Sequence, residues 1–284
     1  MRDVASIADT PPAELRFRRR VGLISTTTDL WRSREVVRSL ADRDFRARYK
    51  QAVLGVAWAV INPLVLALVF TFTVRRFAHV QTDGVPYIIW AYTGLVAWGF
   101  FAGTVTGATA CLVNNQPLLN KVNVPRETFP VATVVLSAVD SAISMIGLIA
   151  FFAIYGRLPR TETIWVPVIL LVQLACVTGV ALIVSIVVVY LRDLRQIVPI
   201  LIQIGLFATP VAYNISQLLS PGWRLVYSFA NPMAPIIDSY RRTVLYGQPP
   251  QWLYLGAGAV TSLVLLAGGL RIFKRLELGI ADLI

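Results

Sequence analysis

The feature that most constrains this chain is a series of six long apolar runs separated by polar or proline-containing stretches. They cover residues 53–74, 87–113, 129–155, 165–191, 197–213 and 252–273. A helix needs about 20 apolar residues to cross about 30 Å of hydrocarbon, and five of the runs reach that length. The run 197–213 is slightly short and contains Pro199 and Pro210. The pattern predicts an all-α polytopic membrane protein with six transmembrane helices.

The composition agrees with a membrane protein and argues against an ordinary soluble domain. Of the 284 residues, 56% are hydrophobic and 14% are charged, and the mean hydropathy is +0.67. The formal net charge is +11, which in a membrane protein indicates basic segments beside anionic lipid. We therefore expect membrane lipid, and no nucleic acid, among the partners.

The residues that catalytic and cofactor sites require are scarce. His79, the one histidine, lies in a predicted external loop, so we expect no histidine-bearing triad or zinc cluster. Cys111 and Cys176 both lie inside apolar runs. No glycine is followed by lysine, so the chain lacks the G-x-x-x-x-G-K-[ST] loop that cradles nucleotide phosphates. We expect no catalytic residue, no metal site and no cofactor in this chain.

Lysine and arginine are distributed unevenly between the two sides of the predicted spans. Residues 1–52 form a basic arm, and residues 53–284 hold the six spans. The side that contains the arm also receives Lys121, Arg126, Lys274 and Arg275. Because basic residues are retained in the cytoplasm, this bias predicts a multi-pass protein of the cytoplasmic membrane with both termini cytoplasmic.

The segment 31–50, within the arm, has helical amphipathicity. At 100° per residue, Arg43, Arg46 and Lys50 gather with Arg32 within roughly 60°, opposite Leu30, Val37, Leu40, Ala41 and Phe45. This pattern predicts an interfacial helix whose apolar side lies among lipid headgroups. A solvated basic tail is the alternative.

The segment 214–251 is too apolar for a free loop and too rich in proline for one span. Pro221, Pro232 and Pro235 interrupt a stretch that includes Trp223 and Tyr227. We predict a re-entrant helical pair before the last span, because broken helices at membrane depth usually line or gate a pathway. An external cap packed on the other spans is the alternative.

Asp140 is the one acidic residue well inside an apolar run. A buried carboxylate is costly unless it is paired, protonated or wetted, so it is a candidate for function. Ser137, Ser141 and Ser144 lie on neighbouring turns, and they favour instead a hydrogen-bonded carboxylate that helps helices pack.

Three segments, in order, resemble one known family. The first is DFRARYK at residues 44–50, followed by Leu54, Gly55, Trp58 and Pro63; the second is NQPLLNKVNVPRE at residues 115–127; the third is SFANPMAP at residues 228–235. They are similar to motifs of polysaccharide-export permeases, the membrane subunits of type-two ATP-binding-cassette exporters. Val124 replaces the phenylalanine usual before the second motif's proline.

The resemblance implies a permease subunit that forms a homodimer and works with two copies of a separate ATPase subunit. ATP and magnesium would be held by that ATPase, and the substrate would be a polysaccharide of O-antigen, teichoic acid or galactan type linked to polyprenyl diphosphate. The resemblance also implies two cytoplasmic elements that contact the ATPase. The residues expected to couple to it are Arg46, Tyr49, Lys50, Leu118, Lys121, Pro125, Arg126 and Glu127.

Family precedent places the first and fifth spans along the channel. Aromatic rings suit the apolar C–H faces of sugars, so the channel-lining candidates are Trp58, Phe70, Phe72, Phe207 and Tyr213. The external gate candidates are Tyr227, Phe229, Asn231 and Pro232. Two other functions stay open from the sequence: a proton-coupled secondary carrier centred on Asp140, and a membrane-embedded enzyme that transfers lipid-linked glycans.

Overall fold

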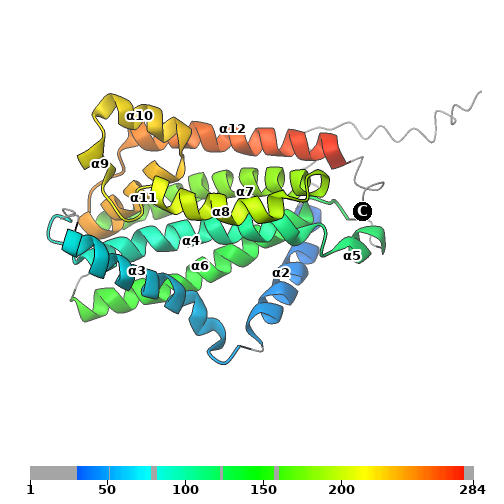
Figure 1. Ribbon diagram of the computed structural model, residues 1–284, viewed down its shortest axis with the longest axis horizontal. Coiled ribbons are helices and arrows are strands. Elements are labelled where there is room, and N and C mark those ends of the chain that lie inside the picture. The colour runs from blue at the N-terminus through cyan, green and yellow to red at the C-terminus, as the bar shows by residue number, and fades with distance from the viewer. Residues whose placement is uncertain (1–30, 51, 78–81, 122–123, 157–159, 278–284) are drawn as a thin grey trace, which may run out of the picture.

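Long helices that run roughly along one common direction make up most of the protein, with shorter and inclined helices at the two ends (Figure 1). The computed structural model describes residues 31–50, 52–77, 82–121, 124–156 and 160–277. Across these ranges the chain forms helices and connecting turns, without strands. The prediction of an all-α polytopic membrane protein is confirmed.

Five helices in the described ranges are long and apolar enough to cross a membrane. They are α3 (Trp58–Phe77), α4 (Tyr87–Cys111), α6 (Thr128–Ile154), α7 (Val166–Tyr190) and α12 (Trp252–Leu276). Short 3₁₀ segments, Gly55–Ala57 and Thr161–Trp165, precede α3 and α7. These five helices match five of the six predicted spans.

The remaining predicted span, the fifth in order at 197–213, corresponds to α8 (Leu194–Ala208), a helix of 15 residues. At 1.5 Å per residue it is about 22 Å long, which is short of the hydrocarbon thickness. The helix ends at Ala208 because Thr209 is extended and Pro210 cannot donate a backbone hydrogen bond. A count of six spans is therefore not confirmed by helix length.

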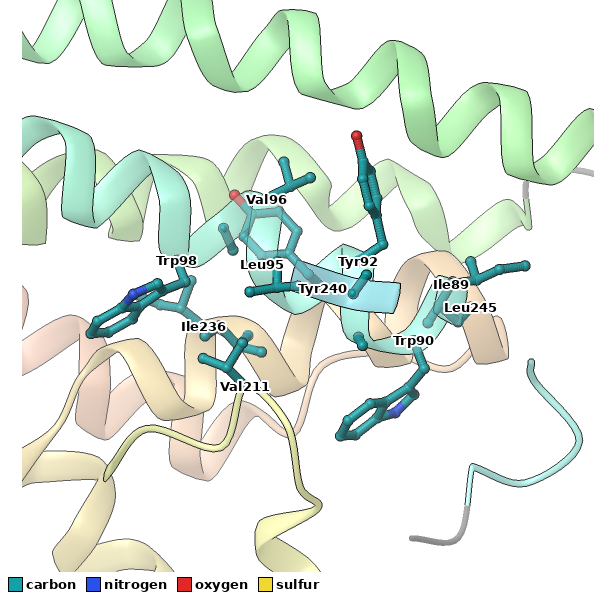
Figure 2. Packing of buried hydrophobic residues seen from close by; sticks show 14 of the residues in the cluster. Ile89, Trp90, Tyr92, Leu95, Val96, Trp98, Val211, Ile236, Tyr240 and Leu245 are labelled. Carbon is teal, nitrogen blue, oxygen red and sulfur yellow. The ribbon is translucent and has the colours of Figure 1, made fainter. Parts of the chain in front are cut away.

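Helix α4 is the centre of the bundle and is the most deeply buried of the long helices. Figure 2 shows Trp90 and Tyr92 pointing to different sides of this helix, with Val211, Ile236 and Tyr240 packed nearby. Its neighbours are α3, α6, α7, α8 and α11. Because a helix that is apolar on every side has no solvent face, its sequence suits this central position.

Helices α7 and α12 pack against each other more extensively than any other pair. A Cβ atom on Gly179 would lie 2.5 Å from the backbone carbon of Leu265, and one on Gly269 would lie 2.6 Å from the Gly179 carbonyl oxygen. The two backbones are therefore in direct contact. Small residues allow such close packing between membrane helices, where van der Waals contact replaces the hydrophobic effect.

The amphipathic segment forms α2 (Arg34–Tyr49), as predicted. Its apolar residues Val37, Leu40 and Ala41 are buried, but they pack against the bundle beside Leu112 and Phe273. The prediction that this face lies among lipid headgroups is wrong, because the protein itself covers it. The predicted contributor Leu30 lies outside the described residues.

The segment before the last span forms short helices, as predicted. They are α9 (Ile215–Leu218), α10 (Pro221–Ala230), α11 (Met233–Tyr240) and a π-helix (Arg241–Tyr246). The segment enters and leaves at the same end of the bundle, opposite α2 and α5 (Gln116–Lys121) (Figure 1). Helix α11 is buried against α4, α7 and α12, whereas α10 packs on α12 and exposes Trp223 and Val226.

Candidate functional site

The end of α2 is connected to α6 through Asp140. The Tyr49 hydroxyl donates to Asp140 Oδ1 at 2.9 Å, and the Arg48 guanidinium forms an ion pair with Asp140 Oδ2. Burial and this hydrogen bond raise the pKa of Tyr49 above its ordinary value, so Tyr49 stays a donor at neutral pH. The carboxylate is therefore paired, and its position inside an apolar run is accounted for by α2.

A cavity of about 430 Å³ lies beside this junction, between α3, α4 and α6. Its lining includes Arg48, Asp140 and Ser137, together with the rings of Trp58 and Trp98. Ser144 closes one side by donating from Oγ to the Ala59 carbonyl oxygen at 2.7 Å, which ties α6 to the start of α3. The cavity thus combines polar and aromatic groups at the α2 end of the bundle.

Two of the gate candidates, Tyr227 and Asn231, form hydrogen bonds with the end of α8. The Tyr227 hydroxyl donates to the Ala208 carbonyl oxygen, and the Asn231 amide donates to Thr209 Oγ1 at 2.8 Å. The Tyr213 hydroxyl donates to the same Ala208 oxygen at 2.6 Å. The two tyrosine bonds satisfy the Ala208 carbonyl group, which the helix end leaves free. Helix α8 and the α10–α11 pair are therefore joined at one place.

Pro232 and Phe229, the other two gate candidates, differ in exposure. Pro232 is buried where α10 turns into α11, and Phe229 is 46% exposed on α10. Among the four gate candidates, Phe229 is therefore the one with a largely exposed aromatic ring.

Arg241 is buried at the first position of the π-helix, with an exposure of 3%. Its guanidinium donates to the carbonyl oxygens of Pro210 at 2.7 Å, Trp90 at 3.2 Å and Val211. It also lies 3.3 Å from the centroid of the Trp90 ring, a cation–π contact. Gly94 leaves room for it, since a Cβ atom there would lie 2.4 Å from the guanidinium. Arg241 therefore fixes the broken backbone after α8 to α4.

The channel-lining candidates divide into exposed and buried side chains. Trp58, Phe72 and Phe207 are 42%, 70% and 65% exposed. Phe70 is only 6% exposed and packs edge-on against Phe207, with ring centroids 6.3 Å apart. The prediction that Phe70 lines a channel is wrong for this arrangement, because α4 and its neighbours cover the ring. Tyr213 is partly buried.

Comparison with known proteins decides the family. The model of the ABC-2 type transporter family matches residues 35–245 of this chain. The chain belongs to the ABC-2 type transporter family. This membership confirms a transport subunit whose ATPase is a separate protein, and it agrees with the lack of a nucleotide-binding loop in the sequence.

Curated relatives of this ABC-2 subunit cover most of its length. It is 29% identical over 253 residues to the O-antigen export system permease protein RfbA of Myxococcus xanthus, which covers 89% of this chain and 96% of the relative. It is 27% identical over 247 residues to the protein of that name from Klebsiella pneumoniae (86% and 93%). It is 21% identical over 248 residues to the polysialic acid transport protein KpsM of Escherichia coli (85% and 93%).

The α2 coupling candidates of this ABC-2 subunit lie near the end of that helix. Arg46 and Lys50 are exposed, and Arg46 forms a 3.0 Å ion pair with Asp42, one turn away. Tyr49 instead points to Asp140. Two cations at the end of α2 are thus open to a partner, and the tyrosine connects the same helix to α6.

The second group of coupling candidates lies on α5 and the turn after it. Leu118 is partly buried, and the side chain of Lys121 lies outside the description. Glu127 is fully buried and forms an ion pair with Lys274 of α12, while Arg126 donates to the Glu277 carbonyl oxygen at 2.5 Å. Because Glu127 is buried, the expectation that it touches an ATPase directly is wrong. Pro125, two residues earlier, is partly buried.

Two functional elements are missing from the sequence prediction. Arg241 is not among the predicted site residues, although it is buried and its guanidinium connects Trp90 of α4 to the chain after α8. Gln173, inside the apolar run of α7, donates to the Ala97 carbonyl at 2.8 Å and accepts from the Tyr240 hydroxyl at 2.9 Å. An amide within an apolar run is a signal that could have found this connection, because such a group needs a partner.

Proposed function

We propose that this protein is the transmembrane subunit of an ATP-driven exporter that moves a lipid-linked polysaccharide across the cytoplasmic membrane. The main support for this proposal is the similarity, over 85–89% of the chain, to proteins named for O-antigen export and polysialic acid transport. The expected substrate is a polymer of O-antigen, teichoic acid or galactan type on a polyprenyl diphosphate carrier. The pairing of Asp140 with Arg48 removes the main reason for a proton carrier centred on that carboxylate.

The conduit for the polymer lies between two copies of this chain, at the outer faces of α3 and α8. Both faces are apolar and largely exposed in one protomer, and they adjoin where Phe70 meets Phe207. Trp58, Phe72 and Phe207 would present rings to the sugar faces. Two-fold pairing is the commonest way in which a subunit covers such a face, which supports a homodimer.

The α10–α11 pair closes the external end of this conduit. The position of the pair supports this role. Tyr227 and Asn231 form hydrogen bonds with the end of α8, which is one of the two helices proposed to line the path. A shift of α10 would therefore move α8 directly. Phe229 is the exposed aromatic ring of the same helix.

The ATPase subunits, one for each copy, carry ATP and magnesium and act on α2. Arg46 and Lys50 are available to an acidic surface, and Asp140 connects the same helix to α6. A displacement of α2 would thus reach α6 and the start of α3 without a flexible linker. Lys121 and Leu118 on α5 are the second proposed contact.

Both termini are cytoplasmic in this proposal. Its support is the positive-inside bias together with the arrangement of the helices, since α2 and the end of α12 lie at the same end of the bundle. Single cysteines in place of Asp83 and Glu162 should react with an impermeant thiol reagent applied from outside, and one in place of Asn120 should not. Reactivity of Asn120→Cys alone would reverse the orientation.

Depletion of this protein in its source cells tests the exporter function. A lipid-linked saccharide should accumulate on the cytoplasmic leaflet, and re-expression of the chain with its ATPase should clear it. A catalytically inactive ATPase should give the same accumulation. Normal surface polysaccharide after complete depletion would contradict the proposal, and loss of a saccharide from both leaflets would indicate a glycan-transferring enzyme.

A further inference from the structure

The cavity between α3, α4 and α6 is too large for a single water molecule. Its volume of about 430 Å³ falls within the roughly 300–1,000 Å³ of pockets for small ligands. It lies inside one protomer and is separate from the outer face of α8. Arg48 and Trp58 are each 42% exposed at its edge, so a ligand can reach it from the α2 end.

One polar side chain that lines this cavity, Ser137, has no hydrogen-bond partner in the described part of the chain. The residue is buried, with an exposure of 2%. Serines inside membrane helices usually donate to a carbonyl of their own helix, as Ser262 of α12 does to the Gly258 carbonyl oxygen at 2.7 Å. The Ser137 Oγ itself has almost no accessible surface, so it can bind a group in the cavity only if the side chain rotates about χ1. Because a buried hydroxyl without a partner costs free energy, a ligand that offers a partner favours that rotation.

The remaining lining combines aromatic rings with an ion pair. Trp58 contributes an exposed indole ring, whereas Trp98 is buried with the tip of its ring against Gly205 of α8. The Arg48–Asp140 pair contributes both donors and acceptors without net charge. Asn62 adds an amide. A pyranose has an apolar C–H face for a ring and hydroxyl groups that both donate and accept, so this set of groups matches a neutral sugar.

Other occupants fit less well. An acyl chain would leave the Ser137 hydroxyl and the ion pair facing hydrocarbon, which is unfavourable. A phosphate would bring negative charge beside Asp140, whose charge already uses the nearest cation, Arg48. A second copy of the chain would have to insert side chains between helices that already contact one another.

We propose that this cavity binds one or two sugar units of the exported polymer, as a saccharide subsite within each protomer. The proposal rests on the proposed function and adds where a single subunit holds its substrate. Asn62 would bind hydroxyl groups, as would Ser137 after rotation of its side chain, and Trp58 would contact a sugar face where the cavity opens.

A photo-crosslinking experiment identifies the occupant. A diazirine-bearing amino acid replaces Leu66, which lines the cavity, in the complete exporter in its own cells. The matched control replaces Leu263, which is 59% exposed on α12. We expect a saccharide adduct at position 66 that disappears when synthesis of the polymer precursor is stopped, and none at position 263. A phospholipid adduct, a subunit–subunit adduct or no saccharide adduct at position 66 would overturn the proposal.

A cavity-filling variant tests whether the subsite is used. A Cβ atom on Gly99 would meet nothing within 4 Å although Gly99 lines the cavity, so Gly99→Leu fills space without a backbone clash. Gly256→Leu on α12 is the control, because a Cβ atom there also meets nothing within 4 Å. We expect export to fall at least tenfold in Gly99→Leu and to stay at the wild-type level in Gly256→Leu. Gly99→Ala is the second, milder variant, with a smaller loss.

The two proposals fail in different ways. If depletion blocks export but Gly99→Leu exports normally with a normal melting temperature, the subsite is wrong and the exporter function stands. If depletion leaves export intact, the function itself is wrong. Ser137→Ala adds a further arm: since this hydroxyl has no protein partner, the change should weaken the position-66 saccharide adduct without lowering thermal stability. Unchanged adduct yield would remove Ser137 from the subsite.

Discussion

Arg241→Met should destabilise the protein by removing the guanidinium that bonds to the Pro210 and Val211 carbonyls in the broken backbone after α8. Methionine fills the space of the arginine side chain as far as Nε, but it lacks the guanidinium group and donates no hydrogen bond. The carbonyl oxygens of Pro210 and Val211 accept from Arg241 and from no other group in the described residues. The Trp90 carbonyl would also lose its bond to the guanidinium.

The size of the effect follows from those carbonyls. A buried carbonyl left without a partner costs about 1–3 kcal/mol, so two of them give about 2–6 kcal/mol. Removing the guanidinium also relieves the cost of burying its charge, which offsets part of the loss. We therefore expect the free energy of unfolding to fall by roughly 2–4 kcal/mol.

Unfolding in mixed micelles titrated with sodium dodecyl sulfate measures this difference. Arg242→Met is the control, because that neighbouring side chain makes one 3.1 Å bond to the Pro249 carbonyl at an exposed position. It should change the free energy of unfolding by less than about 1 kcal/mol. Gly94→Ala should resemble Arg241→Met, since its Cβ would displace the guanidinium. A loss below about 1 kcal/mol in Arg241→Met would refute the reasoning.

Three further variants test the packing and the link to the ATPase. Asp140→Asn keeps one acceptor oxygen, which Arg48 can use, while the Tyr49 hydroxyl can accept from the new amide. Because a partly exposed ion pair contributes little, export should stay near normal with a stability loss of about 1 kcal/mol or less; abolished export from an intact complex would instead indicate a direct role. Gly179→Ala should separate α7 from α12 and lower stability by about 1–3 kcal/mol in the same micelle titration, whereas Gly256→Ala should be neutral; equal stability of the two would contradict the backbone contact. Arg46→Glu combined with Lys50→Glu should reduce co-purification of the ATPase while the permease keeps its melting temperature, and wild-type recovery of the ATPase would remove α2 as a docking element.

The long helices could be predicted because length and hydropathy are local properties of the sequence. The runs at 87–113 and 252–273 became α4 and α12 with small differences in their ends. The short run at 197–213 was recognised as unusual, and its proline accounts for the early end of α8. Whether the 15 residues of α8 cross the membrane depends on how the surrounding helices and the bilayer adapt to a short helix. Local hydropathy carries no information about that adaptation.

The environment of individual polar residues could not be predicted in the same way. Asp140 was recognised as costly, but its partners Arg48 and Tyr49 are more than 90 positions away in the sequence. Glu127 is expected from the sequence to contact the ATPase, whereas in the structure it is buried and paired with Lys274 of α12. In each case the deciding neighbour comes from a distant part of the chain.

The sequence by itself determined that this chain is a helical membrane protein, that α2 is amphipathic, and that a proline-broken segment precedes the last span. These properties depend on residue order over one or two helical turns, or on the thickness of a bilayer. Only the tertiary structure decided that the apolar face of α2 packs on the bundle, that Phe70 is covered, and that Arg241 holds three carbonyl groups. Burial and pairing are set by which helices become neighbours, and that choice depends on the packing of the whole bundle.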